Sequence, residues 1–577
     1  MPVVNADIAS ELDKVADLLE IEGANPFRVR AYRQAARLVG SLPRSVAEMV
    51  AAGDDLDALP GIGQDLAGKI ALIATGKHLP LLDELEREVP PGITALLALP
   101  GLGPKRVHAL HEALGIDSID KLAAAAKSGQ LHTVAGFGPG IEARLVRALA
   151  EGAGQAQRVK LATAEQVAEP LLRHLRGADG VLQVEIAGSY RRRRETVGDL
   201  DIVASAEPGK PVMDRFAGYE DVAEVTERGT TRSTIVLRNG LQVDLRVVAP
   251  ESFGAALLYF TGSKAHNIAL RQIAMARNLK LNEYGLFSGA KRLAGATEQD
   301  LYERLGLTMV PPELREDQGE IDASRQKRLP HLVTLDDIRG DLHMHTTASD
   351  GHDSILAMAR AAQALGRAYI AITDHSKHVA VTHGLDAARL ARQIDEIDRL
   401  NAGLKDFTVL KAIEVDILED GSLDLPDRIL RRLDLVVGAV HSAFDLPRGQ
   451  QTARLLKAMD NPLLNILAHP TGRLINARPG YAVDIEAVMR GARERGCHLE
   501  LNAQPDRLDL NDTSCRLAKE LGLKVAISTD AHATTQLGHM RFGIDQARRG
   551  WLEPGDVLNA ASLADLRRML RRDVPAV

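Results

Sequence analysis

Cysteine is nearly absent from this chain: only Cys497 and Cys515 occur among its 577 residues. So few cysteines exclude a disulfide scaffold and suit a reducing cytoplasm. No apolar run is long enough to cross a membrane, and the first residues lack the basic and then apolar pattern of a secretory signal. We therefore expect a cytoplasmic protein with no membrane partner.

An excess of positive charge is also missing. The chain has 71 Lys and Arg residues against 78 Asp and Glu residues, which gives a formal net charge of −7. Any surface that binds nucleic acid must therefore be local. At 577 residues the chain is too long for one hydrophobic core, and its length is typical of about three to four domains.

The most informative stretch is residues 188–201, which runs Gly-Ser-Tyr, four arginines, and then Glu-Thr-Val-Gly-Asp-Leu-Asp. Valine and isoleucine residues flank it, so it is predicted to form strand, basic turn and strand. Because side chains alternate across a strand, Asp199 and Asp201 should point to the same face. Two close carboxylates repel each other unless a cation lies between them, and oxygen ligands suit magnesium or manganese.

A third carboxylate, Asp244, lies in the alternating apolar segment 242–248, another predicted strand. Three aspartates on adjacent strands can hold two metal ions, which clamp the attacking and leaving oxygens of a phosphoryl transfer. Gly188 would let a phosphate approach the backbone, and Ser189 offers a hydroxyl. The alternative is a solvated basic turn beside surface aspartates, and the combined motif makes it the less favoured interpretation.

At these residues the chain resembles the family X DNA polymerases, a branch of the nucleotidyltransferase superfamily. The family motif reads Gly-Ser-aromatic-Arg-Arg-Gly, a spacer, Asp-x-Asp, and later a strand aspartate. The resemblance implies that Asp199 and Asp201 bind both of two Mg²⁺ or Mn²⁺ ions. It also implies that Asp244 binds the catalytic ion and helps to activate the primer 3′ hydroxyl.

By the same resemblance, Gly188, Ser189 and Arg192 would bind the incoming nucleotide. Arg193 departs from the pattern because the family has glycine at that place. If the turn needs a positive φ, an arginine there is strained, and nucleotide affinity becomes the doubtful quantity.

Near the N-terminus, the pattern apolar-x-Gly-apolar-Gly occurs three times, in residues 59–64, 99–104 and 134–139. Each copy precedes a predicted helix, whose free backbone N–H groups could meet a phosphate. The copies resemble helix-hairpin-helix units, which hold DNA backbones without reading sequence. A purely structural role stays open for the third copy. The expected DNA-binding glycines are Gly61, Gly63, Gly101 and Gly103.

Residues 28–33 and the first hairpin resemble the lyase-like N-terminal domain of some family X members, where a lysine after the hairpin forms a Schiff base. Lys69 falls at that place. Schiff-base chemistry needs a lowered lysine pKa, whereas Asp65 stands where those members carry another lysine. We therefore favour a contact between Lys69 and a DNA phosphate.

Aromatic residues make up only 3% of the chain, yet Tyr259 and Phe260 stand side by side before Thr-Gly-Ser. Residues 259–267 are similar to the nucleotide-selecting segment of the family, in a predicted helix 255–278. The similarity implies that the two rings wall the sugar pocket and that Asn267 meets the base edge, with Arg271 on the template side of the DNA. The alternative is a pair of core aromatics at a helix start. The implied nucleotide-binding residues here are Tyr259, Phe260, Gly262 and Asn267.

In the C-terminal part, histidines and carboxylates follow successive predicted strands that alternate with helices. This order predicts a (β/α) barrel with an active site at the C-terminal ends of its strands. Mixed His and carboxylate ligands suit zinc, manganese or iron, and their number implies more than one ion. Clustered metal ions generate hydroxide and neutralise phosphate, which indicates phosphoester hydrolysis.

This part resembles a PHP (polymerase and histidinol phosphatase) domain with a trinuclear site of up to three Mn²⁺, Zn²⁺ or Fe ions. No ligand place is lost, so we expect activity, namely manganese-dependent trimming of DNA 3′ ends. His352 competes with Asp350 for the third place. The nine implied ligands are His343, His345, Asp350, His375, Glu414, His441, His469, Asp530 and His532.

Taken together, the chain resembles a bacterial family X DNA polymerase that fills short gaps in DNA repair, base excision repair included, and trims 3′ ends. Cutting at abasic sites is a further expectation. The fold class is multidomain α+β and α/β. The expected parts are a lyase-like helix-hairpin-helix domain (1–80), helix-hairpin-helix fingers (81–150), a nucleotidyltransferase palm with a mixed sheet (151–252), a thumb (253–312), a linker (313–339) and a PHP barrel (340–577).

The expected partners are gapped or nicked DNA and dNTPs, bound by a monomer that associates with the nucleoid when on DNA. Two rivals remain open at this point. One is an end-processing nuclease whose polymerase site is impaired by Arg193. The other is a small-molecule phosphomonoesterase, against which the hairpin repeats argue.

Overall fold

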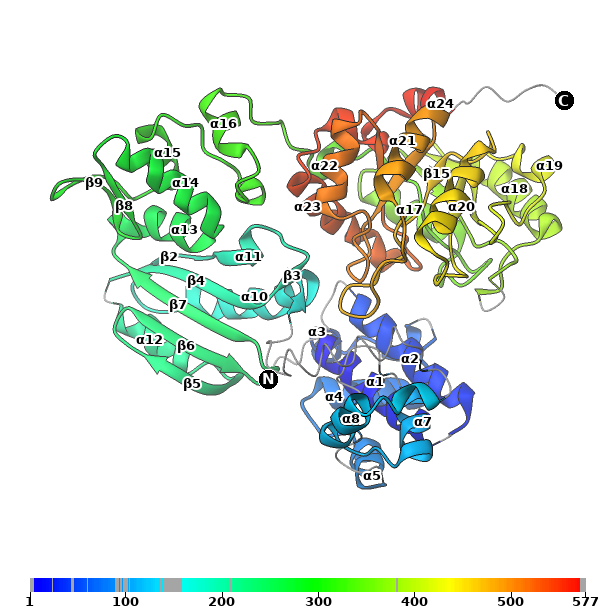
Figure 1. The fold of residues 1–577 in the computed structure, drawn as a ribbon, viewed down its shortest axis with the longest axis horizontal. Coiled ribbons are helices and arrows are strands. Elements are labelled where there is room, and N and C mark those ends of the chain that lie inside the picture. The colour runs from blue at the N-terminus through cyan, green and yellow to red at the C-terminus, as the bar shows by residue number, and fades with distance from the viewer. Residues whose placement is uncertain are drawn as a thin grey trace. The chain divides into compact units, whose positions relative to one another are not determined.

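The structure of the protein is a computed structural model, and the chain divides into two compact units, Met1–Val159 and Lys160–Val577 (Figure 1). Each unit is described by itself. The described residues are 5–570 except 23, 43–45, 60, 89–92, 94–95, 97–101, 103, 135–136, 138–157, 208 and 380–381.

The first unit is helical. In α2, Asn25 caps the N-terminus by accepting a hydrogen bond from the Phe27 N–H at 2.9 Å, and Pro26 occupies the first helical position, where a missing N–H costs nothing. Ile8, Val39 and Ile70 are fully buried in the shared core. Its helices are α1 (Asn5–Ile21), α2 (Pro26–Ser41), α3 (Val46–Ala52), α4 (Gln64–Ala74), α5 (Pro80–Glu88), α7 (Pro104–Leu114) and α8 (Ile119–Lys127).

The second unit begins with a five-stranded mixed sheet in the order β2-β4-β7-β6-β5, preceded by β1 (Val159–Lys160) and α10 (Leu161–Arg176). β4 runs antiparallel to β2 and parallel to β7. The expected basic turn begins with a single helical turn, α11 (Gly188–Arg191). The remaining elements are β2 (Val181–Ile186), β3 (Thr196–Val197), β4 (Asp199–Ala206), α12 (Lys210–Ala217), β5 (Val222–Arg228), β6 (Arg232–Leu237) and β7 (Gln242–Val248).

The predicted helix 255–278 is two helices, α13 (Phe253–Thr261) and α14 (Lys264–Met275). Gly262 ends the first with a φ of 70°, and Ser263 starts the second by accepting a hydrogen bond from the His266 N–H. Glycine reaches a positive φ without steric cost, and serine is a favoured N-cap, so these two residues explain the break. The three-stranded sheet β8 (Lys280–Asn282), β9 (Gly285–Ser288) and β10 (Lys291–Ala294) and the helix α15 (Glu298–Arg304) follow.

The segment 313–339, expected as a linker, is partly folded. It contains α16 (Glu320–Arg325) and the fully buried Arg315. Ile321 packs in the same hydrophobic core as Leu258 of α13 and Trp551 from near the C-terminus. Apolar packing therefore joins this segment to elements on both of its sides in the sequence.

The C-terminal part is a seven-stranded, all-parallel sheet in sequential order, β11 to β17. A parallel bridge between Met344 and Ala531 brings the first and last strand ends together, so the sheet is a nearly closed barrel. The strands are β11 (Gly340–Asp341), β12 (Tyr369–Ile372), β13 (Thr408–Asp416), β14 (Leu435–Ala439), β15 (Ile466–Leu467), β16 (His498–Asn502) and β17 (Val525–Ser528).

Helices alternate with these strands, as the sequence predicts for a (β/α) barrel. They are α17 (Ile355–Ala364), α18 (Ala387–Asn401), α19 (Asp427–Leu430), α20 (Arg448–Asp460), α21 (Ile485–Arg495), α22 (Asp512–Glu520), α23 (Met540–Arg549) and α24 (Leu563–Leu570) (Figure 1).

Candidate active sites

Three aspartates converge at the ends of two neighbouring strands. Asp201 of β4 lies directly opposite Asp244 of β7, and Asp199 precedes Asp201 on the same face. Oxygen atoms of the three carboxylates lie within 4.8 Å of one another. Burial, followed by the charges of Asp199 and Asp244, raises the pKa of Asp201 to about 7. A divalent cation among these oxygens would remove that repulsion, so the group fits a metal ion.

Gly188 and Ser189 lie next to this group. Gly188 has a φ of 61°, and a Cβ there would lie 2.4 Å from Asp201 Oδ2, so only glycine lets the turn approach the aspartate this closely. Among the described residues, the buried hydroxyl of Ser189 has no hydrogen-bond partner. Buried polar groups are rarely left without a partner, so this hydroxyl is suited to binding a ligand oxygen.

Arg192 and Arg193 are engaged within the protein. Arg192 donates to the carbonyl of Thr261, and its Nε lies 3.1 Å from a carboxylate oxygen of Glu316. Arg193 has a φ of 55°, so it adopts the positive φ for which glycine is favoured. Its side chain forms an ion pair with Glu165 at 2.8 Å.

The predicted nucleotide-selecting residues lie around the break between α13 and α14. The rings of Tyr259 and Phe260 meet edge to face with their centroids 5.1 Å apart. The guanidinium of Arg271 lies 5.1 Å from the Tyr259 ring centroid, and that of Arg246 lies 5.1 Å from the Phe260 ring centroid. Asn267 donates to the carbonyl of Tyr259 at 2.7 Å, so in this structure it holds the end of α13.

In the first unit, Gly61 has a φ of 75° in the turn before α4, and Gly63 is the N-cap residue of that helix. Gly101 and Gly103 of the second hairpin lie outside the described residues. The Lys69 ammonium lies 2.8 Å from the Tyr32 hydroxyl and 2.5 Å from Asp65 Oδ2. Burial lowers the pKa of Lys69, but these two hydrogen bonds outweigh it and raise the pKa above its ordinary value. A raised pKa is unfavourable for a Schiff-base lysine.

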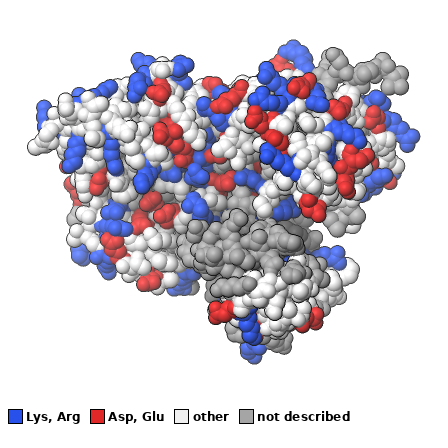
Figure 2. Space-filling model, viewed as in Figure 1, with Lys and Arg blue, Asp and Glu red and all other residues white. Residues whose placement is uncertain are grey.

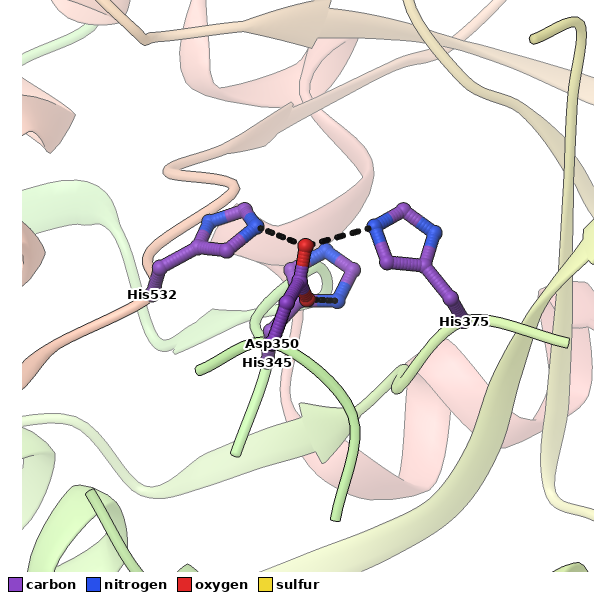
Figure 3. Close-up of side chains that lie close together, drawn as sticks. All are labelled: His345, Asp350, His375 and His532. Atoms are coloured by element: carbon purple, nitrogen blue, oxygen red, sulfur yellow. Dashed lines mark ion pairs between the residues drawn. The ribbon is translucent and has the colours of Figure 1, made fainter. Parts of the chain in front are cut away.

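In the barrel, Asp350 lies among three imidazoles (Figure 3). Its carboxylate oxygens are 3.5 Å from His375 Nε2, 3.5 Å from His532 Nε2 and 3.8 Å from His345 Nδ1. Burial raises the pKa of Asp350, yet its bonds to His375 and His532 hold it well below the usual range. Burial, followed by the neighbouring His532 and His375, lowers the pKa of His345 to about 4.

Two further groups adjoin this one. His343, His345 and Asp530 form the first, and His375, Glu414 and His441 form the second, each with ligand atoms within 4.8 Å of one another. His469 Nε2 lies 3.1 Å from Glu414 Oε1, so all nine predicted ligands meet at one end of the barrel. His352, the competitor for the third place, belongs to none of the three groups found among the described residues.

The donor set of these groups fits metal ions. Four buried atoms of the set make no hydrogen bond to any described residue, namely His343 Nε2, His345 Nδ1, His375 Nδ1 and Glu414 Oε2. These atoms face one another or neighbouring carboxylates, with His375 Nδ1 only 2.7 Å from Glu414 Oε2, and a metal ion would satisfy several of them at once. The nine predicted ligands therefore lie together, and their donor atoms suit divalent ions.

Three buried carboxylates next to the predicted ligands were not assigned as site residues. Glu500 of β16 lies 2.7 Å from His343 Nδ1 and accepts a hydrogen bond from the His469 N–H at 2.9 Å. Asp416 of β13 lies 3.1 Å from His441 Nδ1. Asp374 accepts hydrogen bonds from Thr346, Ser349 and Gln393. Their only sequence signal is their position at or near the ends of strands.

Charge is mixed on the face drawn in Figure 2. On the face drawn in Figure 2, Lys and Arg side chains are interspersed with Asp and Glu side chains, which agrees with the absence of a global basic excess. Among the described residues, no helix combines the length and apolarity needed to cross a lipid bilayer.

Family models match four parts of the chain. A helix-hairpin-helix domain matches residues 3–79, and a SAM-like helix-hairpin-helix tandem matches residues 93–151. A DNA polymerase beta thumb matches residues 256–316, and a PHP domain matches residues 341–503.

Two curated relatives illustrate how far the similarity extends. A probable phosphatase of Thermoanaerobacter sp. (strain X514) is 31% identical over 231 residues, which are 38% of this chain and 89% of the relative. The DNA polymerase/3′-5′ exonuclease PolX of Bacillus subtilis (strain 168) is 39% identical over 571 residues, which are 98% of this chain and 99% of the relative. Similarity at this level over both whole chains shows that the protein belongs to the PolX family of bacterial family X DNA polymerases with a PHP domain.

Proposed function

We propose that this protein is a DNA-directed DNA polymerase that fills short gaps during DNA repair and that also removes nucleotides from DNA 3′ ends. The observation that carries the polymerase function is the Asp199, Asp201 and Asp244 group beside the buried, unpartnered hydroxyl of Ser189. Carboxylates for metal ions and a free donor for phosphate are the two things that nucleotidyl transfer requires.

In the polymerase site, Asp199, Asp201 and Asp244 would hold two Mg²⁺ or Mn²⁺ ions, which supply Lewis acidity and neutralise phosphate charge. Ser189 donates its hydroxyl to the triphosphate. Asp244 helps to activate the primer 3′ hydroxyl; its carboxylate is oriented by hydrogen bonds from Thr234 at 2.5 Å and Gln242 at 2.8 Å. Tyr259 and Phe260 border the sugar, and a bulky wall there disfavours a ribose 2′ hydroxyl.

In the barrel, the nine His and carboxylate ligands would hold up to three Mn²⁺, Zn²⁺ or Fe ions, which supply an activated water and neutralise the phosphodiester. Glu500 and Asp416 fix the orientation of His343 and His441 through the ring nitrogens that face away from the cluster. The substrate is the 3′-terminal phosphodiester of DNA, with cleavage at abasic sites as a second reaction of the same site.

The first unit supplies DNA binding. The Gly61–Gly63 turn before α4 presents the helix N-terminus to a DNA phosphate. Lys69 contacts the DNA backbone and does not form a Schiff base, because its ammonium is held by hydrogen bonds to Asp65 and Tyr32. Gapped or nicked DNA and dNTPs are the partners, and the protein acts as a cytoplasmic monomer at the nucleoid.

The experiment compares extension and shortening of a labelled primer on gapped DNA, with Mn²⁺ and dNTPs, in three proteins. We expect the wild type to do both, Asp199→Ala/Asp201→Ala to shorten without extending, and His343→Ala to extend without shortening. Shortening without extension by the wild type would contradict the polymerase function and leave an end-processing nuclease.

A phosphomonoesterase is the second candidate for the barrel, because a probable phosphatase matches 38% of the chain. Hydrolysis of p-nitrophenyl phosphate by the wild type, lost in His343→Ala and accompanied by no shortening of DNA, would favour it.

A further inference from the structure

The phosphate-binding part of the polymerase site is contacted by the nuclease barrel. We name residues 188–195 the arginine turn; they lie between β2 and β3. The contacting element is α23 (Met540–Arg549) of the barrel. Both elements lie in the same compact unit of the chain.

Two side chains of α23 bind successive carbonyl groups of the arginine turn. Arg549 donates to the Arg192 carbonyl at 2.7 Å, and Gln546 donates to the Arg193 carbonyl at 3.1 Å. Both donors are buried, with 6% of Arg549 and 1% of Gln546 exposed. Buried hydrogen bonds to backbone carbonyls fix the local path of a turn, since breaking either leaves a buried polar group without a partner.

Arg549 and the side chain of Arg192 also share an acceptor. Arg549 lies 3.1 Å from the same Glu316 oxygen that pairs with Arg192 Nε. Asp512 of α22 accepts from Arg549 Nε at 2.9 Å and from a terminal nitrogen at 2.6 Å, which anchors the guanidinium to the barrel. Arg549 therefore binds Asp512 of the barrel and, at the same time, the Arg192 carbonyl of the arginine turn.

The position that departs from the family motif lies at the centre of this contact. Arg193 has a φ of 55° and offers its carbonyl to Gln546. Its Nε lies 3.8 Å from Asp545 of α23. The strained residue therefore takes part in the interface through both its backbone and its side chain.

We propose that α23 holds the arginine turn in the conformation that receives the triphosphate, so that Gln546 and Arg549 are positioning residues for DNA synthesis. Neither residue touches the reacting atoms. This inference rests on the proposed polymerase function. It gives the nuclease domain a second role, which is to support nucleotide binding at the polymerase site.

The test measures KM for dNTP and kcat in single-nucleotide insertion into gapped DNA by the full-length protein. Arg549→Gln shortens the donor and removes the charge that pairs with Asp512 and Glu316. Gln546→Glu keeps the size of the side chain but replaces its donor with a carboxylate that repels the Arg193 carbonyl. We expect the dNTP KM to rise about tenfold in each, as for a lost buried hydrogen bond, with kcat within about twofold of the wild type. The 3′-5′ exonuclease rate should not change, which shows that the variants are folded.

Arg548→Gln is the matched control. Arg548 neighbours Arg549 on α23 but pairs with Glu313 at 2.8 Å and with the Val333 carbonyl, and it does not contact the arginine turn. We expect its dNTP KM to equal that of the wild type. An equal rise in Arg548→Gln, or an unchanged KM in both Gln546→Glu and Arg549→Gln, would overturn the inference. A wild type that inserts no nucleotide would instead overturn the polymerase function on which it rests.

Discussion

At the scale of single residues, three of the predicted ligands, His343, His441 and His469, are held by a carboxylate outside the predicted set. Glu500 illustrates this, because one of its oxygens meets His343 and the other meets the backbone of His469. A carboxylate on the far nitrogen of an imidazole fixes its orientation and raises its basicity as a ligand. The strand 498–502 gives no local sign of this role, since a buried Glu between two leucines could equally serve packing or catalysis.

Glu500→Gln should lower the exonuclease rate about 10- to 100-fold and raise the Mn²⁺ concentration needed for half-maximal activity, because a neutral amide orients His343 less strongly. Primer shortening as a function of Mn²⁺ concentration measures this. Primer extension in the same samples serves as the control and should not change. An unaltered exonuclease rate would mean that His343 is oriented without Glu500.

At the same scale, the pKa of Asp545 is raised to about 7, mainly by burial and also by Glu165 and Glu313, against the lowering effect of Arg193. An unfolded aspartate has a pKa of about 4, so the native state binds the extra proton between about pH 4 and pH 7. This contribution to stability is fully present below about pH 4 and is lost as the pH rises through about 7.

Between pH 5 and pH 8, the free energy of unfolding should therefore fall less in Asp545→Asn than in the wild type. Urea unfolding of the wild type and the variant at both pH values measures the difference. An identical fall in the two proteins would show that Asp545 does not carry the proton.

At the scale of elements, the arginine turn joins β2 to β3 and β4, and β4 carries Asp199 and Asp201. Its path depends on positive φ values at Gly188 and Arg193. A non-glycine residue in the left-handed region costs about 1–2 kcal/mol, and the ion pair between Arg193 and the buried Glu165 offsets part of that cost.

Arg193→Gly and Arg193→Val separate backbone from side chain. Glycine adopts a φ of 55° freely, so Arg193→Gly should keep the dNTP KM within about threefold of the wild type and change stability by about 1 kcal/mol or less. Valine is β-branched and strongly disfavours this φ, so Arg193→Val should raise the dNTP KM about tenfold or more. Primer-extension kinetics give both values. A KM raised more by glycine than by valine would show that the side chain, and not the backbone, is required.

At the scale of the whole molecule, the fold class followed from local sequence patterns, whereas packing between distant segments did not. The alternation of strands and helices predicted the barrel, and the glycine repeats predicted a helical N-terminal region, because both depend on local periodicity. The burial of the segment 313–339 could not be predicted, because it depends on distant residues: Ile321 packs in a core that includes Trp551. The break after Thr261 was also missed, although Gly262 and Ser263 are ordinary helix-ending and helix-starting residues.

The sequence by itself determined which chemistry the protein can perform. Alternation along a strand brings Asp199 and Asp201 to one face, and barrel topology brings the histidines of separate strands to one end. Only the tertiary structure decided which residues support that chemistry. Glu500 meets His343, and Arg549 meets the arginine turn, across separations of 157 and 357 residues. Spacing along a strand or helix is a property of neighbouring residues, whereas these contacts exist only after the sheet has closed and α23 has packed against the turn.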